Sequence, residues 1–274
     1  MAGNSKKYPN YILFTLSLGI SLIIAEISIR AMLGNQLYLP ETERSLTYRY
    51  DEQLGWFPKE HSTATFDLTT TIDINHNSRG FRDDEHEPDH RSSVVFLGDS
   101  FTWGYDVQAE DRFTNVLKDS FPELNLFNMG VSGYGNDQEL LLLRDQINFY
   151  KPELIILVFC ADNDRLDNSM NIRYVNYYKP YFEQHKSTLL LKGQPVPHSA
   201  IHWFSENPFA SKSYLIRMVV NAWFRNKNPE QILVPDPTHL IIREMFQLAS
   251  KNDSKLLETA TGSRTTSLPS AGRP

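Results

Sequence analysis

The sequence predicts an α/β fold, a three-layer α/β/α arrangement with a parallel sheet, preceded by one N-terminal transmembrane helix. Short apolar runs alternate with helical stretches over residues 93–160, and an uncharged apolar stretch lies near the N-terminus. The chain has 274 residues, of which 41% are hydrophobic, so it can bury a core. Its net charge of -6 argues against a nucleic-acid partner, and its one cysteine, Cys160, excludes an intramolecular disulfide.

The apolar stretch near the N-terminus predicts a membrane anchor. Fifteen uncharged residues run from Tyr11 to Ala25. A helix that extends from Tyr11 to Leu33 rises about 34 Å, which is enough for a hydrocarbon core of roughly 30 Å. The extension carries Glu26 and Arg30, which lie four residues apart and can pair near the end of the helix.

The basic residues before this helix predict its orientation. Lys6 and Lys7 favour a cytoplasmic N-terminus, which places the rest of the chain on the extracytoplasmic side, periplasmic or extracellular. The alternative is a cleaved signal peptide, but a cut after Ala25 would put bulky Ile23 where a small residue is preferred. We therefore expect a single-pass membrane protein that has the lipid bilayer as a partner. The expected division is residues 1–10 in the cytoplasm and residues 11–33 in the membrane.

Residues 34–92 are polar, punctuated by proline and without a sustained helical period, so we interpret them as an irregular lead-in. Within them, Ser62 to Asn75 alternates well enough for one or two strands or a hairpin. The run from Asp83 to His90 contains metal-ligand residue types. Pro88 and the crowded like charges favour a solvated loop there, so we expect no metal site.

The core domain is predicted over residues 93–257. We expect strands at Ser93–Leu97, Leu124–Met129 and Glu153–Cys160, separated by helices at Arg112–Phe121 and from Asn136 or Asp137 to Tyr150. The order β-α-β-α-β implies right-handed crossovers and a parallel sheet with helices on both faces. In such sheets ligands bind at the carboxyl ends of the strands.

Three polar blocks stand at those strand ends. They are Gly98-Asp99-Ser100, Gly130-Val131-Ser132-Gly133 and Ala161-Asp162-Asn163-Asp164. The combination suits acyl transfer, because a serine supplies the nucleophile while backbone N–H groups and a carboxamide hold the developing oxyanion. An α/β-hydrolase elbow would need a second glycine where Thr102 stands. A dinucleotide fingerprint also fails, because residues 130–135 read G-x-x-G-x-G, and we expect no cofactor.

The three blocks, in this order, resemble those of the SGNH (GDSL-like) hydrolase family, in particular its membrane-anchored bacterial members. The resemblance implies an SGNH or flavodoxin-like fold with Ser100 as the nucleophile. It also implies an oxyanion hole made by the N–H groups of Ser100 and Gly133 and by the Asn163 side chain; Ala161 replaces the glycine of the family's third block. The implied activity is that of a serine esterase or O-acyltransferase acting on acyl esters, acetyl esters above all, of envelope glycans or lipids.

The family's fourth block, Asp-x-x-His, is matched at Asp236-Pro237-Thr238-His239. By resemblance, His239 is the general base and Asp236 its partner. The alternative is a helix N-terminus with Asp or Thr as the cap and Pro at an early position.

The position of this block argues against catalysis. Family members have at least one more sheet strand before the histidine loop, whereas this chain starts such a strand only at Lys255-Leu256-Leu257, and residues 258–274 have the composition of a disordered tail. One economical account is a C-terminally incomplete domain without its true catalytic histidine. We therefore expect a poor or inactive hydrolase. The alternative function is a catalytically impaired, membrane-tethered binding or scaffold module on the same fold.

Overall fold

The computed structural model describes residues 8–174 and 176–262, and the chain divides into two compact units. The first unit comprises Met1–Glu41 and Ser199–Pro229, and the second comprises Thr42–His198 and Glu230–Pro274. This division corrects the expectation of one domain over residues 93–257. The segment Ser199–Pro229 leaves that domain because its helices pack with the N-terminal helix.

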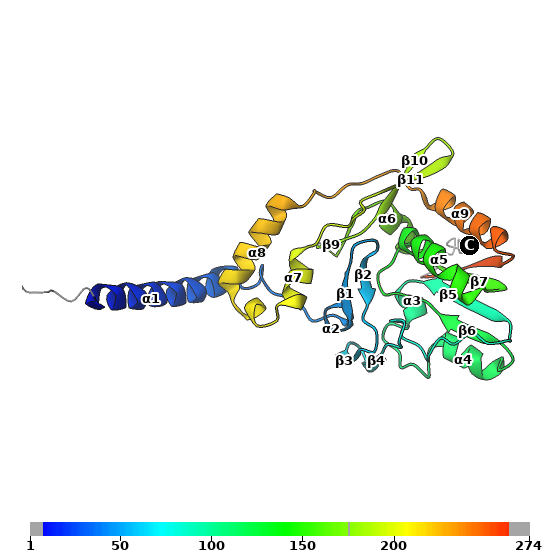
Figure 1. The fold of residues 1–274 in the computed structure, drawn as a ribbon, viewed down its shortest axis with the longest axis horizontal. Helices are drawn as coiled ribbons and strands as arrows, with labels where there is room; N and C mark the ends of the chain where they lie inside the picture. The colour runs from blue at the N-terminus through cyan, green and yellow to red at the C-terminus, as the bar shows by residue number, and fades with distance from the viewer. Residues whose placement is uncertain (1–7, 175, 263–274) are drawn as a thin grey trace, which may run out of the picture. The chain divides into compact units, whose positions relative to one another are not determined.

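The second unit is built on a four-stranded parallel sheet in the order β12-β7-β5-β6 (Figure 1). Three of its strands are apolar runs expected from the sequence: β5 (Ser93–Gly98), β6 (Asn125–Asn128) and β7 (Leu154–Cys160). β5 lies between the other two and pairs with both in parallel. The carboxyl ends of all three strands therefore meet at one edge of the sheet.

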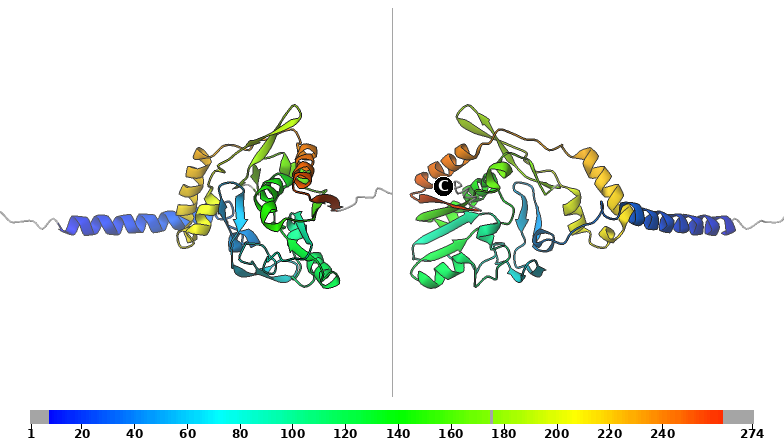
Figure 2. Two further views of the ribbon diagram at one scale, coloured as in Figure 1. Left: turned by 45° about the vertical axis from the view of Figure 1, so that its right-hand side comes forward. Right: turned by 180° about the vertical axis from the view of Figure 1, so that it is seen from behind.

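Helices cover both faces of the sheet. α4 (Phe113–Ser120) covers one face, where its Leu117 packs with Val94 and Phe96 of β5. Because alternate strand residues point to opposite faces, the buried Val95 points away from α4. α5 (Asn136–Tyr150) and α9 (Thr238–Lys251) pack against each other beside the sheet (Figure 2). The predicted α/β/α arrangement with a parallel sheet is confirmed.

The fourth strand, β12 (Lys255–Thr261), is longer than expected. It pairs in parallel with β7 over its whole length, from Lys255 opposite Leu154 to Thr261 opposite Cys160. The prediction of a tail from residue 258 was therefore wrong for its first residues, while residues 263–274 lie outside the described part of the chain. The reason is that β12 is an edge strand with mostly exposed side chains, so small polar residues suit it as well as apolar ones.

The segment before the sheet is more regular than the predicted lead-in. The hairpin expected within Ser62 to Asn75 is present as β3 (Thr63–Asp67) and β4 (Thr71–Asn75). A further antiparallel pair precedes it, and its Trp56 is completely buried. The additional elements of this segment are α2 (Glu43–Thr47), β1 (Tyr48–Asp51) and β2 (Gly55–Pro58).

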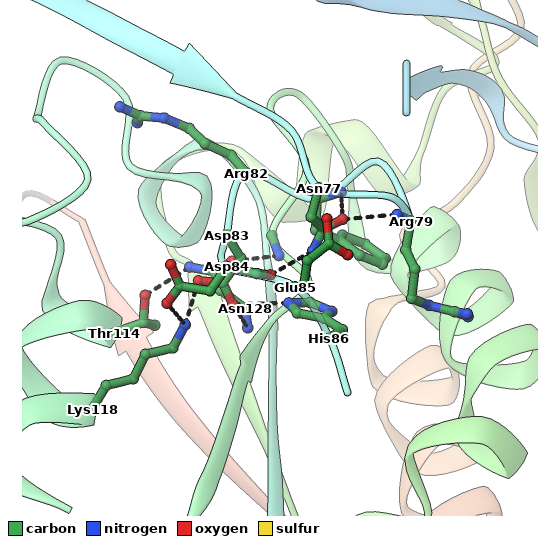
Figure 3. Close-up of polar contacts among 12 residues, drawn as sticks. Asn77, Arg79, Arg82, Asp83, Asp84, Glu85, His86, Thr114, Lys118 and Asn128 are labelled. Atoms are coloured by element: carbon green, nitrogen blue, oxygen red, sulfur yellow. Dashed lines mark hydrogen bonds and ion pairs between the residues drawn. The ribbon is translucent and has the colours of Figure 1, made fainter. Parts of the chain in front are cut away.

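The expected solvated loop at Asp83 to His90 is partly buried and contacts the sheet. Figure 3 shows Asp83 between Lys118 and His86; the backbone N–H of Asn128 bonds the same carboxylate oxygen as His86. The Asp83 carboxylate accepts hydrogen bonds from Arg112 at 3.0 Å, Lys118 at 2.5 Å and the Asn128 backbone N–H at 2.9 Å. His86 lies 2.9 Å from Asp83 through Nε2. Ion pairing, rather than hydration, satisfies the charge of Asp83.

The rest of the second unit consists of short antiparallel ribbons. One of them is a hairpin that pairs Tyr181–His185 with Thr188–Lys192. The ribbon strands are β8 (Ile172–Arg173) with β9 (Tyr177–Tyr178), and β10 (Tyr181–His185) with β11 (Thr188–Lys192).

The first unit is helical. α1 (Tyr8–Leu33) contains the predicted membrane segment, and the expected pair of Glu26 with Arg30 is formed at 3.3 Å. Phe204 and Phe224 form a small buried cluster with Ala200 between the other helices. Those helices are α7 (Ala200–Glu206), a 3-10 turn (Ala210–Lys212) and α8 (Tyr214–Lys227).

Candidate active site

Ser100 is the first residue of α3 (Ser100–Trp103), directly after β5. Asp99 caps this turn, since its Oδ1 accepts the backbone N–H of Phe101 at 3.0 Å. The N–H of Ser100 itself has no acceptor within the helix because it lies in the first turn. The Ser100 hydroxyl is half-buried and has no hydrogen-bond partner among the described residues. Both groups are therefore free for a ligand.

The glycine turn of the second block lies against α3. The backbone N–H of Val131 donates to the Gly98 carbonyl at 3.0 Å. At Gly130 a Cβ atom would lie 2.5 Å from the backbone nitrogen of Trp103, so only glycine permits this approach. Gly133 has a φ of +83°, and its N–H has no acceptor within residues 8–174 and 176–262. The turn thus contacts α3 at Gly130 and the first block at Val131, and it carries an N–H group without an acceptor in the described residues at Gly133.

Asn163 stands directly before α6 (Asp164–Asn168) at the end of β7. Its Nδ2 donates to Oδ2 of Asp99 at 3.3 Å and to Oδ2 of Asp167 at 2.9 Å. Asp167 is in turn paired with Arg173. The first and third blocks are therefore joined directly. Both hydrogens of the Asn163 amide are held by carboxylates, so one of them must be released before it can bind an oxyanion.

Buried carboxyl groups surround these blocks. Burial raises the pKa of Asp99, and it raises the pKa of Asp167 to about 6 although Arg173 opposes it. Asp164 and Glu139 share the amide of Asn136, at 3.1 and 3.0 Å. Burial and the neighbouring charges raise the pKa of both groups, that of Asp164 to about 8. The site therefore holds carboxyl groups that keep a proton near neutral pH.

Three residues beside the glycine turn have no signal in the sequence. Oε1 of the buried Glu43 accepts a hydrogen bond from the Ser132 hydroxyl at 2.6 Å, and Arg44 pairs with Glu43. The Arg44 guanidinium lies 3.9 Å from the ring centre of Tyr174, and a Cβ on Gly133 would lie 2.8 Å from that ring. Tyr174 has a φ of +49°, a conformation unusual for a non-glycine residue. These contacts bring together residues far apart in the sequence, so no local motif predicts them.

The fourth block is not joined to Ser100. Oδ1 of Asp236 accepts the Thr238 backbone N–H at 2.9 Å, and Oδ2 pairs with Arg165 at 3.1 Å. His239 is exposed on α9, and neither Ser100 nor Asp236 hydrogen-bonds to it in the described part of the chain. The geometry is that of a helix start, as in the alternative interpretation, but the cap position is Pro237 rather than the expected Asp or Thr.

Metal-ligating side chains do not gather anywhere in the described residues. No group of three or more His, Cys, Asp or Glu side chains there could hold an ion. His86, the best-placed histidine of the acidic run, uses one ring nitrogen on Asp83 and the other on the Tyr150 hydroxyl at 2.6 Å.

Comparison with known proteins gives structural likenesses only: no family model and no curated protein matches the chain. A lipolytic protein of the G-D-S-L family from Veillonella parvula is 15% identical over 61% of this chain and 77% of its own, with a TM-score of 0.26. The esterase EstA from Pseudoalteromonas sp. is 14% identical over the same shares, with a TM-score of 0.27. The SGNH-hydrolase family esterase AlinE4 is 16% identical over 62% and 77%, with a TM-score of 0.26.

The chain also matches TesA over 24% of its length, spanning 39% of that protein at 17% identity and a TM-score of 0.23. The chain's own structure shows a parallel sheet in an α/β/α arrangement, with the three motif blocks at its strand ends.

Proposed function

We propose that the chain is a membrane-anchored SGNH-type serine esterase or O-acyltransferase that acts on acyl esters, acetyl esters above all, of envelope glycans or lipids. The observation that carries this proposal is the hydrogen bond from Asn163 to Asp99, the residue before Ser100. It supports the proposal because it brings the Asn163 amide to the turn that starts at Ser100. The N–H of Gly133, on the glycine turn packed against the same α3, has no acceptor in the described residues. A nucleophile with oxyanion donors around it is what acyl transfer requires.

In the proposed reaction, Ser100 Oγ attacks the ester carbonyl carbon, and its proton passes to the leaving alcohol. The N–H groups of Ser100 and Gly133 hold the charge on the carbonyl oxygen, with the Asn163 amide as the third donor. Water or a sugar hydroxyl then takes the acyl group and returns a proton to Ser100. No described histidine hydrogen-bonds Ser100, so we expect turnover about 10²- to 10⁴-fold below that of a site with a paired base.

Labelling with a fluorophosphonate tests this proposal, because the probe reacts with activated serines. We expect slow labelling of the full chain in detergent and none of Ser100→Ala. Ser120→Ala, which removes an exposed hydroxyl at the end of α4, serves as the matched control and should label like the wild type. Equal labelling of the wild type and Ser100→Ala would overturn the assignment of the nucleophile.

The anchoring part of the proposal rests on α1. Its segment Asn10–Leu33 is long and apolar enough to cross a bilayer, a test that a signal sequence near the N-terminus also passes. Its two charged residues, Glu26 and Arg30, neutralise each other. The neutralised pair supports a helix that is retained in the membrane. Lys6 and Lys7 before the helix support a catalytic unit outside the cytoplasm. A C-terminal reporter that works only after export should be active; an expressed but inactive reporter would reverse the orientation.

One observation favours the alternative of a membrane-tethered binding or scaffold module. The Ser100 hydroxyl lacks a histidine partner in the described residues, and a serine without a base stays protonated and weakly nucleophilic. Complete absence of labelling, together with saturable binding of an acetylated glycan that Ser100→Ala retains, would favour the module over the enzyme.

A further inference from the structure

The carboxylate of Glu26 joins α1 to α8 by hydrogen bonds. Glu26 of α1 accepts hydrogen bonds from the Ser213 hydroxyl at 2.8 Å and from the backbone N–H groups of Tyr214 and Leu215, both at 2.9 Å. Arg30 pairs with Glu26 and lies 4.4 Å from the ring centre of Tyr214. The first turn of α8 is therefore held at the last turns of α1.

The position of this junction along α1 gives its depth in a bilayer. From Asn10 to Glu26 the helix rises about 24 Å, and a hydrocarbon core is roughly 30 Å thick. With Asn10 at one boundary, Arg30 falls at the other and Glu26 about 6 Å inside it, close enough to the headgroups for a charged pair to be tolerated. Both views in Figure 2 show α8 running across the end of α1 rather than along it. If α1 spans the membrane, α8 starts at the membrane surface and runs along it.

α8 exposes an apolar stripe, formed by Ile216, Val219 and Trp223. These residues are three and four positions apart, so they share one face of the helix. Val219 is 56% and Trp223 54% exposed, whereas Phe224 on another face is buried in the cluster with Phe204. The stripe is therefore not the side by which α8 packs in its own unit.

Basic and aromatic residues mark both ends of the apolar stripe. Phe209, just before α8, is 85% exposed, and Nζ of Lys212 lies 5.4 Å from its ring centre. At the other end, Nζ of Lys227 lies 4.8 Å from the Trp223 ring centre. An apolar face with tryptophan and flanking lysines suits the boundary between acyl chains and anionic headgroups.

We propose that the apolar stripe of α8 lies in the bilayer interface, with Lys212 and Lys227 at anionic headgroups. The chain then contacts the membrane through two helices, one that crosses it and one that lies on it. This inference rests on the anchoring by α1 proposed above and is independent of the esterase activity. Lipid is favoured as the occupant because the stripe begins where α1 meets the headgroup region.

Tryptophan quenching in nanodiscs tests the proposal on the full chain. Discs with anionic lipid are made with and without bromine on the acyl chains near the headgroups, since bromine quenches only tryptophans in contact with lipid. We expect about a twofold loss of the Trp223 emission in brominated discs. Trp223→Phe should abolish the lipid-dependent loss, whereas Trp203→Phe, at a half-buried tryptophan of the same unit, should retain it.

Two further variants separate the possible failures. Leu16→Trp places a reporter in the middle of α1, and its quenching in discs with bromine near the ends of the acyl chains reports on anchoring alone. If Leu16→Trp is quenched but the Trp223 emission is not, the stripe faces water or another protein and the proposal is overturned while anchoring stands. If neither is quenched, the anchoring itself fails. Replacing Lys212 and Lys227 by Glu should reduce quenching of Trp223, whereas Arg225→Glu, on the other side of α8, should not.

Discussion

Nδ2 of Asn163 lies 3.3 Å from Oδ2 of Asp99, so the residue before the proposed nucleophile is bonded to the proposed oxyanion donor. The same nitrogen donates to Asp167 at 2.9 Å. Asn163 therefore has two possible functions, as a tie between the ends of β5 and β7 and as a donor to the transition state. Loss of a transition-state donor lowers kcat, whereas loss of a structural tie lowers stability.

We predict that Asn163→Ala lowers kcat for p-nitrophenyl acetate by about 10²- to 10³-fold with little change in KM, because an oxyanion donor acts only in the transition state. Steady-state kinetics and the rate of fluorophosphonate labelling both measure this effect. The control is Leu166→Ala, at an exposed position on α6. A variant that only melts at a lower temperature, with kcat intact, would make Asn163 a structural tie.

The fourth block is predicted to be dispensable for chemistry. His239→Ala should leave labelling of Ser100 within about twofold of the wild type, since a base acts only within hydrogen-bond reach of the nucleophile. Asp236→Ala should instead lower the free energy of unfolding by about 1 kcal/mol, because it removes the acceptor for the Thr238 N–H at the start of α9. A hundredfold loss of activity in His239→Ala would identify that histidine as the base.

Local signals explain which elements the sequence predicts. β5 and β7 are continuous apolar runs, and α5 ends where Lys151-Pro152 stops it, so each is recognisable from a few neighbouring residues. β12 lacks such a signal beyond Leu257, because an exposed edge strand accepts threonine and alanine. The order of the three blocks predicts that they share an edge, since parallel strands end on the same side.

Long-range contacts explain what the sequence does not predict. The Ser132 hydroxyl donates to Glu43, which lies 89 residues earlier, and no pattern in either segment indicates the other. The segment at Asp83 and His86 looks like a solvated loop, because its charge is visible in the sequence while the partners that neutralise it are far away. Arg112 lies directly before α4 and Lys118 lies within it, and both contact Asp83 only in the folded chain.

The carboxyl pair of Asp164 and Glu139 predicts an unusual pH dependence of stability. Burial raises the pKa of Asp164 to about 8, whereas it titrates near 4 when the chain is unfolded. The folded state therefore keeps a proton that the unfolded state loses. The stability contributed by this group is full below about pH 4 and is lost as the pH rises to about 8.

Asp164→Asn should remove this dependence, because an amide carries no charge and still offers an oxygen to the Cys160 N–H that Asp164 binds at 2.7 Å. We expect the variant to melt higher than the wild type at pH 8.5 and to differ little at pH 5 in thermal unfolding. Asp119→Asn, at an exposed position of α4, is the control and should follow the wild-type profile. The same dependence of melting temperature on pH in the wild type and Asp164→Asn would contradict this prediction.

Asp83 is predicted to stabilise the second unit through its charge. Burial alone raises its pKa, but the hydrogen bond from His86 and the charge of Lys118 outweigh burial and lower the pKa to about 2. Its contribution is therefore present above about pH 4 and lost as the pH falls toward 2. Asp83→Ala leaves the buried Arg112 without its carboxylate, and removing one partner of a buried pair costs about 3–5 kcal/mol.

The neighbouring Asp84 provides the matched control for this prediction. It pairs with the same Lys118 at 3.0 Å, as Figure 3 shows, but its side chain is 76% exposed. Exposed pairs contribute about 0–1 kcal/mol, so Asp84→Ala should barely change the denaturant midpoint. Asp83→Ala should shift it strongly or prevent folding, in which case Asp83→Asn, which keeps an oxygen for the Asn128 N–H, gives a measurable intermediate loss. Equal denaturant midpoints for Asp83→Ala and Asp84→Ala would show that the buried charge of Asp83 contributes no more to stability than the exposed charge of Asp84.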